Sequence, residues 1–478
     1  MASHTPKIFF FPLMAPGHTL PMVDLAKLFA AHDVEVTLLA IPSSIPPLRS
    51  MIGGQPIKLL SLLLPPGSLN LPGGHQNLSS LPSVALSPEF FEALELLRQP
   101  LDQLLRAHRP SCIISDMFLP WTAEVAAAIG IPRFVFHSMG FFPLCMIDRL
   151  RQYESAEDLP QGNNGTVLVP GLPHQIVMKK SQLHDSVRAR NKFSGFMDMV
   201  AESELQSVGA VVNSFYELEP AYADHFRTFM RKKAWHVGPV SAINREAKEL
   251  AARGGCSPVS QAKSSSHGRT SLLSWLNAKL PCSVLYVCFG SLSKLATAQL
   301  EQISMALEAS NYPFLWVIGG HESEQQMEIV REEGEGLIVR GWAPQMLILS
   351  HPSVGGFVTH CGWNSLMESV SAGVPVVTWP LFAEQFYNEK LAVDILRVGV
   401  AVGAEEWGMR EEEKAVIAAE KIGEAVDRVM NGGEEAEALR QRARELGDTA
   451  KKAVAAGGSS HTDLSRLIVD LMKVQLQD

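Results

Sequence analysis

The sequence lacks several features that would assign it to a common class of protein. Its 478 residues contain no apolar run of about 18 residues, so we expect no membrane-spanning helix. Its six cysteines show no CxxC spacing, and several lie in apolar, strand-like segments, which favours reduced thiols over a disulfide framework. The first residues carry no signal-peptide cleavage pattern, so we expect a cytoplasmic protein.

Blocks of like charge are also missing. The chain has 41 Lys and Arg residues against 50 Asp and Glu residues, and its net charge is −9. With no basic cluster, nucleic acids and anionic membranes are poor partners, and a phosphate-bearing ligand would have to be bound by local donors. No group of residues has the spacing of metal ligands, so we expect no metal site.

The chain does contain a repeated alternation of strand and helix patterns. We predict a strand at Lys7–Leu13, a turn at Met14–Pro21, a helix at Met22–His32 and a strand at Val34–Leu39. This βαβ start lacks the GxGxxG turn that a nicotinamide or flavin oxidoreductase would use. Further strands are expected at 59–64, 112–115, 133–137, 209–213 and 234–237, helices at 89–108 and 122–129, and an irregular segment at 150–182.

A second alternating region follows a stretch rich in Ser, Ala, Gly and basic residues at 241–269, which is typical of a flexible linker. With 46% apolar residues, the chain has enough core-forming side chains for two or three domains. We predict an α/β protein with two doubly wound parallel sheets facing each other across a cleft. Strands are expected at 283–289, 313–318, 336–340, 355–359, 374–378 and 399–402, and helices at 297–309, 366–372, 411–430, 434–455 and 462–476.

The stretch Trp342–Gln385 contains the clearest candidate ligand site. A strand at Gly355–Thr359 leads into the turn His360–Ser365 and a short helix at Leu366–Ala372. Ligands of parallel sheets bind where strands end and helices begin, and a helix N-terminus favours phosphate. The turn carries a His, an Asn and a Ser, which suit an anion, although Asn364 and Ser365 are also ordinary N-cap residues.

Other polar or aromatic residues follow strands in this region. Trp342 either stacks on a base or belongs to the core. Gln345 and Glu368 either bind ribose hydroxyls or lie on the surface, whereas Glu384 and Gln385 form a polar planar pair that suits sugar hydroxyls. Gly290–Ser291 offers a second polar turn at the same sheet edge.

His18 and Asp116 follow two strands of the first half, so both are expected at one edge of the sheet. A His whose protonated form is stabilised by a carboxylate is a general base. The other interpretation is that each residue only caps a helix.

These motifs together resemble the plant family 1 UDP-glycosyltransferases. Trp342–Gln385 has the length of the family's signature box, begins with Trp, carries HCGWNS and ends with Gln. The resemblance extends over nearly the whole chain, through PLMAPGHTLPMVDLAKLF, SDMFLPW, VPGLP, VVNSFYELEP, WHVGPV and VLYVCFGSL. The details, including FAEQFYNEKL, are most similar to the branch acting on flavonoids, other phenolics, triterpenoids and steroids.

The resemblance implies a GT-B fold with two Rossmann-like domains. It places an acceptor-binding domain at 1–240, a linker at 241–270, a UDP-sugar-binding domain at 271–460, and a C-terminal helix at 461–478 that packs back on the first domain. It also implies a metal-independent monomer whose partners are a UDP-sugar and a hydrophobic small molecule. The reaction implied is a single displacement with inversion at the anomeric carbon.

The resemblance also implies a role for each matching residue. His18 is the base and Asp116 its partner, and the terminal Gln385 favours UDP-glucose. For the donor, Trp342 and Ala343 bind uracil, Gln345 and Glu368 bind ribose, Ser291, His360, Asn364 and Ser365 bind the diphosphate, and Trp363, Glu384 and Gln385 bind the sugar. Phe118, Ser138 and Phe382 are expected to line the acceptor pocket, together with residues 65–88 and 140–200.

Two positions depart from the family pattern, and three alternatives stay open. Leu366 stands where Thr is usual, and Ser138 stands where related proteins often have a Thr that touches the sugar. The alternatives are a C-glycosyltransferase acting on a polyphenol, a transferase using a different UDP-sugar, and a sugar-nucleotide-binding protein without turnover.

Overall fold

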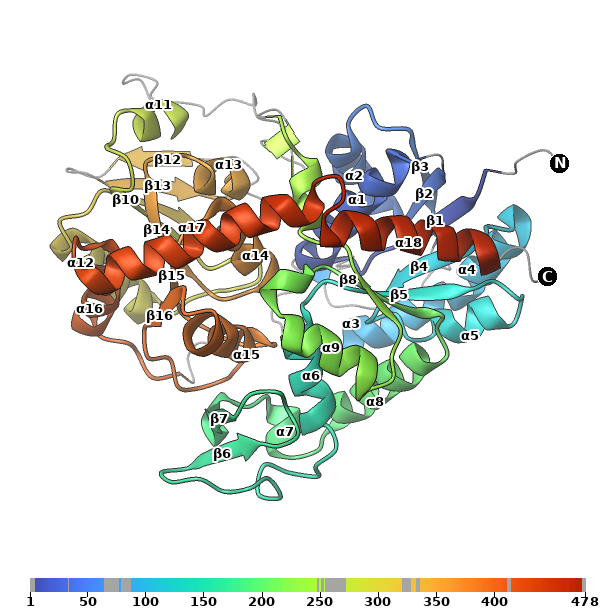
Figure 1. Cartoon of the computed structure of the whole chain (residues 1–478), viewed down its shortest axis with the longest axis horizontal. Helices are drawn as coiled ribbons and strands as arrows, with labels where there is room; N and C mark the ends of the chain where they lie inside the picture. Colours follow the sequence, from blue (N-terminus) through green and yellow to red (C-terminus); the bar gives the residue numbers. More distant parts are fainter. Residues whose placement is uncertain are drawn as a thin grey trace.

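The structure is a computed structural model that describes residues 5–32, 34–63, 77–78, 87–246, 249–250, 253, 272–319, 328–331, 336–410 and 414–474. Its described residues form two seven-stranded sheets, each with helices packed around it (Figure 1). The predicted α/β class with two doubly wound sheets is therefore confirmed. None of the described helices is long and apolar enough to cross a membrane.

The first sheet is parallel throughout, in the order β3-β2-β1-β4-β5-β8-β9. Its strands are β1 (Lys7–Phe11), β2 (Glu35–Ala40), β3 (Ile57–Ser61), β4 (Cys112–Asp116), β5 (Arg133–His137), β8 (Gly209–Val212) and β9 (Ala234–His236). Its helices are α1 (Pro16–Ala30), α2 (Ile45–Ile52), α3 (Ser87–Leu94), α4 (Arg98–His108), α5 (Thr122–Ala127), α6 (Phe141–Leu150), α7 (Asp185–Arg188), α8 (Lys192–Leu205) and α9 (Pro220–Thr228).

The sequence of β1 explains why both faces of this sheet are covered. Ile8 and Phe10 belong to the apolar cluster that includes α1, whereas Phe9 and Phe11 belong to the cluster that includes α4 and α5. Successive side chains of a strand point to opposite faces, so an unbroken apolar run needs helices on both sides. This arrangement leaves the strand ends as the place where polar residues gather.

The second sheet has the order β12-β13-β11-β10-β14-β15-β16, with β12 antiparallel and its other pairings parallel. Its strands are β10 (Val284–Cys288), β11 (Phe314–Ile318), β12 (Glu328–Arg331), β13 (Gly336–Arg340), β14 (Val354–Thr359), β15 (Val376–Thr378) and β16 (Gly399–Ala401). Its helices are α11 (Leu272–Asn277), α12 (Thr297–Ala309), α13 (Gln345–Leu349), α14 (Trp363–Ala372), α15 (Gln385–Lys390), α16 (Ala419–Met430) and α17 (Glu434–Val454).

Several element boundaries were predicted incorrectly, and prolines account for two of them. α1 begins at Pro16, not at Met22, because a proline in the first turn needs no hydrogen-bond donor. The helix predicted at 89–108 is divided by the 3-10 turn η5 (Glu95–Leu97). Pro100 lacks the N–H that would continue the α-helical ladder to the Leu96 carbonyl, which favours the interruption.

Three further predictions need correction. α14 begins at Trp363 with Gly362 as its N-cap, so Asn364 and Ser365 lie in its first turn and are not caps. The segment 150–182 is not wholly irregular, because β6 (Thr166–Val169) and β7 (Ile176–Lys179) form an antiparallel hairpin. α16 begins at Ala419, later than predicted.

The proposed linker at 241–270 lies largely outside the described residues. Its first part is described, and η8 (Val240–Ile243) packs against α1. The domain boundary there stays a prediction.

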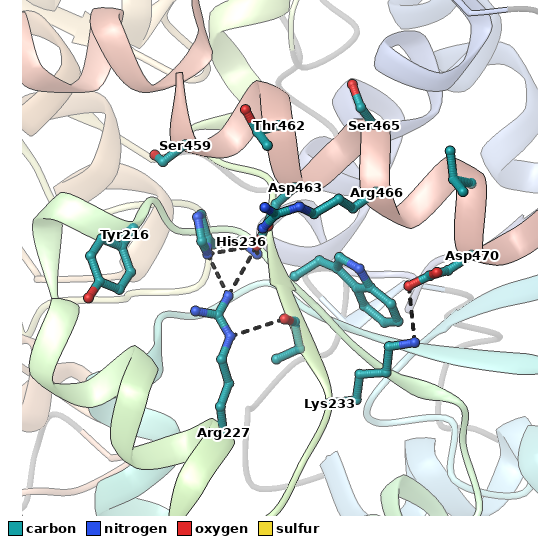
Figure 2. Close-up of a pocket in the computed structure, with 13 residues that line it drawn as sticks. Tyr216, Arg227, Lys233, His236, Ser459, Thr462, Asp463, Ser465, Arg466 and Asp470 are labelled. Atoms are coloured by element: carbon teal, nitrogen blue, oxygen red, sulfur yellow. Dashed lines mark hydrogen bonds and ion pairs between the residues drawn. The ribbon is translucent and has the colours of Figure 1, made fainter. Parts of the chain in front are cut away.

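The last helix, α18 (Ser459–Val474), packs on the first sheet (Figure 1). Leu464, Leu467 and Leu471 share one face of the helix and belong to the same apolar cluster as Ile8. A hollow of about 860 Å³ lies beside this contact, and Figure 2 shows its charged groups turned toward one another. Asp463 is central among them and is only 6% exposed.

Asp463 joins α18 to β9 and α9 through several bonds. Its carboxylate lies 3.0 Å from His236 Nδ1 and accepts from Arg227 Nη2 at 3.1 Å and from Arg466 Nη1 at 3.3 Å. These charged groups therefore pair with one another. The hollow marks the line of ion pairs along which the last helix packs on the first domain.

The substitution Asp463→Ala is expected to weaken this docking. Leaving the buried His236 and the partly buried Arg227 without their shared carboxylate costs about 2 kcal/mol, which corresponds to about 4–8 °C in the unfolding midpoint of a domain of this size. Thermal unfolding followed by circular dichroism measures the shift. Asp448→Ala, which removes an exposed carboxylate paired with Lys451 on α17, is the control. Equal shifts in the two variants would contradict the docking role.

Candidate active site

The two residues expected to form a catalytic pair are in contact. His18 lies in the first turn of α1, and Asp116 is the last residue of β4, the strand beside β1. His18 Nδ1 is 2.8 Å from Asp116 Oδ2, and Asp116 is fully buried. With Nδ1 bonded to the carboxylate, Nε2 is left as the basic nitrogen. Neither residue is the N-cap of the helix it was weighed for, since α1 has Ala15 and α5 has Trp121 at that position.

The protonation of His18 reflects two opposing effects. Burial lowers the pKa of the imidazole, but the charge and hydrogen bond of Asp116 outweigh it, so the pKa lies above its ordinary value of 6.5. Ser138 Oγ is also 3.1 Å from His18 Nδ1. Ser138 thus touches the base, and its expected place in the acceptor pocket stays a prediction.

The loop that carries Ser138 is held by a buried carboxylate. Glu219 accepts the N–H groups of Phe141 and Phe142 at 2.8 and 2.7 Å and the hydroxyl of Ser214 at 2.5 Å. Burial raises the pKa of Glu219 to about 7. A Cβ atom at Gly140 would lie 2.3 Å from the ring of Trp363, so this loop packs directly against the second domain.

Helix α1 also meets α14, the helix of the signature box. The Asn364 amide donates from Nδ2 to the carbonyl oxygen of Gly17 at 2.6 Å. In an uninterrupted helix that carbonyl would accept the N–H of residue 21, but Pro21 has none. The proline therefore leaves an acceptor beside His18, and Asn364 uses it.

Trp363 makes a second bond between the sheets. Its indole Nε1 donates to the carbonyl of Asn213 at 2.8 Å, and the side chain is 3% exposed. The carboxylate of Glu384 accepts from Asn388 Nδ2 at 3.3 Å. Burial raises the pKa of Glu384, although the neighbouring His18 opposes the shift. Glu384, one of the three residues expected at the donor sugar, is therefore close enough to the base to interact with its charge.

His360 lies between two glycine turns at the ends of β10 and β14. A Cβ atom at Gly290 would lie 2.6 Å from its ring, and one at Gly362 would lie 2.5 Å away. Burial lowers the pKa of His360 to about 4, so the imidazole is neutral near pH 7. Its Nδ1 has no hydrogen-bond partner among the described residues, and the same holds for Trp342 Nε1 and Ser293 Oγ. The exposed Ser291 follows Gly290.

The residues expected at the ribose are also in contact. Gln345 donates from Nε2 to Glu368 Oε2 at 2.9 Å and to Ser365 Oγ at 3.0 Å. Trp342 and Ala343, the residues expected at the uracil, lie in the loop after β13. The carbonyl of Ala343 accepts the N–H of Gln345 at 2.9 Å. Glu368 is 5% exposed and receives a further bond from Arg253.

Gln385 is held in one orientation by its own backbone turn. Its Oε1 accepts the N–H groups of Leu381 and Phe382 at 2.9 and 3.0 Å. Both acceptor sites of that oxygen are then used, and the amide can only donate to a further ligand. Phe382 itself is buried.

An aromatic wall adjoins the base, and the sequence indicated Phe118 as part of it but not Phe91 or Phe196. Phe118 lies edge-to-face with His18, with ring centroids 5.3 Å apart. Phe91 and Phe196 stack on each other at 4.9 Å and contact Phe118 at 5.6 and 6.1 Å. The signal in the sequence for the other two is that Phe196 lies in the segment 140–200 expected near the acceptor and Phe91 lies just beyond the segment 65–88. Most of 65–88 lies outside the described residues.

Comparison with known proteins identifies the family. The family described as "UDP-glucoronosyl and UDP-glucosyl transferase" matches residues 264–434. An anthocyanin 3'-O-beta-glucosyltransferase of Gentiana triflora is 41% identical over 481 residues, covering 97% of this chain and 98% of that protein. The chain belongs to the plant family 1 UDP-glycosyltransferases. It is an enzyme that transfers a sugar from a UDP-sugar to a small-molecule acceptor, and this excludes the alternatives of an oxidoreductase and of a binding protein without turnover.

Two other matches show how the transferase relates to its family. A soyasapogenol B glucuronide galactosyltransferase of Glycine max is 39% identical, covering 98% of this chain and 96% of that protein. The crystal structure of Glycyrrhiza uralensis UGT73P12 complexed with glycyrrhetinic acid 3-O-monoglucuronide superposes with a TM-score of 0.88 at 38% identity, covering 99% and 97% of the two chains. The expected GT-B fold is therefore confirmed.

The pKa of His18 generates a prediction for the Asp116→Asn variant. A base must be neutral to accept a proton, so the rate of the transferase falls as pH drops through the raised pKa of His18. Without the Asp116 charge, burial is opposed only by the weaker effect of the Glu384 charge, and the pKa falls below its ordinary value. The acid limb of kcat/KM is expected to move to lower pH, with a lower plateau because the tautomer is no longer held.

The pH dependence of kcat/KM between about pH 5 and pH 9 measures this shift, since the window brackets the ordinary pKa of His. Asp102→Asn, at a partly exposed carboxylate paired with Arg106 on α4, is the control and should leave the profile unchanged. An acid limb that stays in place in Asp116→Asn would show that Asp116 does not set the protonation of the base.

Proposed function

We propose that this transferase moves glucose from UDP-glucose, with inversion, to a hydroxyl group of a hydrophobic plant secondary metabolite, either a flavonoid or other phenolic or a triterpenoid or steroid. The observation that carries the proposal is the 2.8 Å contact between His18 and Asp116 in a helix turn that is itself bonded to Asn364 of the signature box. The base and the donor box are thereby adjacent.

In the proposed reaction, His18 Nε2 takes the proton of the acceptor hydroxyl. The acceptor oxygen forms a bond with the anomeric carbon while the bond from that carbon to the diphosphate breaks, and UDP leaves with the electron pair. Asp116 stabilises the imidazolium that forms. The base belongs to the first domain and the diphosphate to the second, so attack comes from the face opposite the leaving group and the configuration inverts.

The donor roles follow the signature box. Trp342 and the Ala343 backbone would bind uracil, Gln345 and Glu368 the ribose, and Trp363, Glu384 and Gln385 the glucose. The diphosphate would lie against Ser291, His360, Asn364 and Ser365, and the unpaired Nδ1 of His360 supports this placement. The arriving negative charge would raise the low pKa of His360 and strengthen its hydrogen bond. Ser293, whose buried hydroxyl also lacks a partner among the described residues, joins this set.

The acceptor pocket would be lined by Phe118, Phe91 and Phe196 next to His18. Aromatic side chains give a large apolar contact area and stack on flat ligands. The names of relatives support acceptors of several shapes, since they include an anthocyanin and a soyasapogenol B glucuronide. Ser138 would help to orient the imidazole of His18 through the contact of its hydroxyl with Nδ1. Phe382 would contribute through its backbone N–H, which holds the side chain of Gln385.

The substitution His18→Ala tests the proposed chemistry. A general base contributes about 10²–10⁴ in rate, so kcat should fall by that factor while the affinity for UDP is unchanged. Turnover is measured by product mass with UDP-glucose and a panel of phenolics, triterpenoids and steroids, and UDP binding by calorimetry. His108→Ala, at an exposed residue of α4, should retain full activity. Near-normal turnover of His18→Ala would remove His18 as the base.

The substitution Gln385→His tests the choice of sugar. An imidazole cannot accept the two N–H groups that Gln385 Oε1 accepts and also donate from an amide, so a hydrogen bond to glucose is lost. We expect kcat/KM for UDP-glucose to fall about tenfold, which is the value of one such bond. Parallel assays with UDP-glucose and UDP-galactose give the ratio, and an unchanged ratio would show that Gln385 does not select the sugar.

A further inference from the structure

A buried arginine connects the two domains at the proposed ribose site. Arg253 is 9% exposed and bonds through Nε to Asp24 Oδ2 of α1 at 2.7 Å. Its Nη1 donates to Glu368 Oε1 of α14. Burial would lower the pKa of Arg253, but the two carboxylates outweigh burial and raise it. One guanidinium thus joins a carboxylate of the first domain to a carboxylate of the second.

The partners of Arg253 are themselves anchored. Asp24 is 1% exposed and accepts from Asn244 Nδ2 at 2.8 Å, and Asn244 in turn accepts from Lys27 Nζ at 2.7 Å. The backbone N–H of Arg253 donates to the carbonyl of Glu249 at 3.0 Å. The guanidinium is therefore held from the side of the first domain, and it presents a fixed donor to Glu368.

Glu368 retains the capacity to accept further hydrogen bonds. An ionised carboxylate has about four acceptor sites. Arg253 takes one at Oε1 and Gln345 takes one at Oε2, at 2.9 Å. Two sites then remain, which matches the two vicinal hydroxyls of a ribose. Arg253 and Gln345 together also restrict the rotation of this carboxylate.

We propose that Arg253 is a positioning residue of the donor site, holding the Glu368 carboxylate oriented to accept both ribose hydroxyls and tying that site to the helix that carries His18. The inference rests on the proposed function, because the ribose role of Glu368 is part of it. Arginine suits the task because its planar fork bonds two carboxylates at once, whereas a lysine ammonium is a point charge.

The consequence is a second connection between the donor and the base. α1 carries His18 in its first turn and Asp24 further along, and both ends of that stretch reach α14, through the Gly17–Asn364 bond and through Arg253. Binding of the nucleoside at Glu368 would therefore also affect the position of α1, the helix that carries the catalytic base.

The test compares the binding of UDP with that of 2′,3′-dideoxy-UDP by calorimetry. In the unmodified transferase we expect UDP to bind at least about tenfold more tightly, because the hydroxyls donate to a charged acceptor. In Arg253→Met this preference should fall to the level measured for Glu368→Gln. Arg253→Lys should restore part of it, since it restores the charge but not the fork. Arg428→Met, at an exposed ion pair with Glu435, is the matched control.

The outcomes separate the inference from the proposed function. If the unmodified enzyme binds both nucleotides equally, the ribose role of Glu368 fails and the inference fails with it. If the preference exists and Arg253→Met retains it, even with a lower unfolding temperature, Arg253 is only structural and the inference alone is overturned. Tighter UDP binding by Arg253→Met would also overturn it, because Arg253 would then compete with ribose.

A second variant keeps the test decisive if Arg253→Met does not fold. Asp24→Asn retains the guanidinium but removes the charge that anchors it. A reduced preference for UDP in this variant, with Glu368 and Gln345 untouched, supports positioning through Asp24. An unchanged preference overturns that positioning.

Discussion

The meeting of α1 with α14 is the constraint on which the active site depends. Each helix begins at the carboxyl end of a strand, one in each sheet, so their first turns carry the groups aimed at a ligand. The Gly17 carbonyl is available because Pro21 cannot donate to it, and Asn364 occupies it at 2.6 Å. Together with the bond from Trp363 Nε1 to the Asn213 carbonyl, this bond holds His18 beside the first turn of α14. A change of register in either helix would separate the base from the donor box.

Two features determine the electrostatics of the site: some buried charged groups are paired, and the donors expected at the diphosphate are neutral. The chain is acidic, and the turn expected to hold a diphosphate presents a neutral His360 and hydroxyl and amide groups. Several buried carboxylates have a basic partner, such as Asp116 with His18 and Asp24 with Arg253, whereas Glu219 is held by N–H and O–H donors. An isolated buried charge would be costly, whereas neutral donors fixed between glycine backbones need no rearrangement when an anion arrives.

Much of the fold was accessible from the sequence because it depends on local patterns. The apolar, β-branched strands such as β4 and β14 and the helix α12 lie close to where periodicity placed them. Errors arose where a single residue overrides the pattern. Pro16 allowed α1 to begin early, and Gly362 moved the start of α14 ahead of the residues that look like caps. The roles of Asn364 and Trp363 in joining the domains could not follow from N-cap chemistry.

The sequence by itself determined the alternating α/β architecture, the family and the set of residues from which a donor site can be built, because ordered motifs and strand-end positions are properties of short segments. Only the tertiary structure decided which of those residues touch. The pairs His18–Asp116, Arg253–Glu368 and Asn364–Gly17 are separated by 98, 115 and 347 residues. The same holds for Ser138, which contacts the base, and for the aromatic wall of Phe91, Phe118 and Phe196. Such contacts depend on how sheets and helices pack in three dimensions, and no local period in the chain encodes that packing.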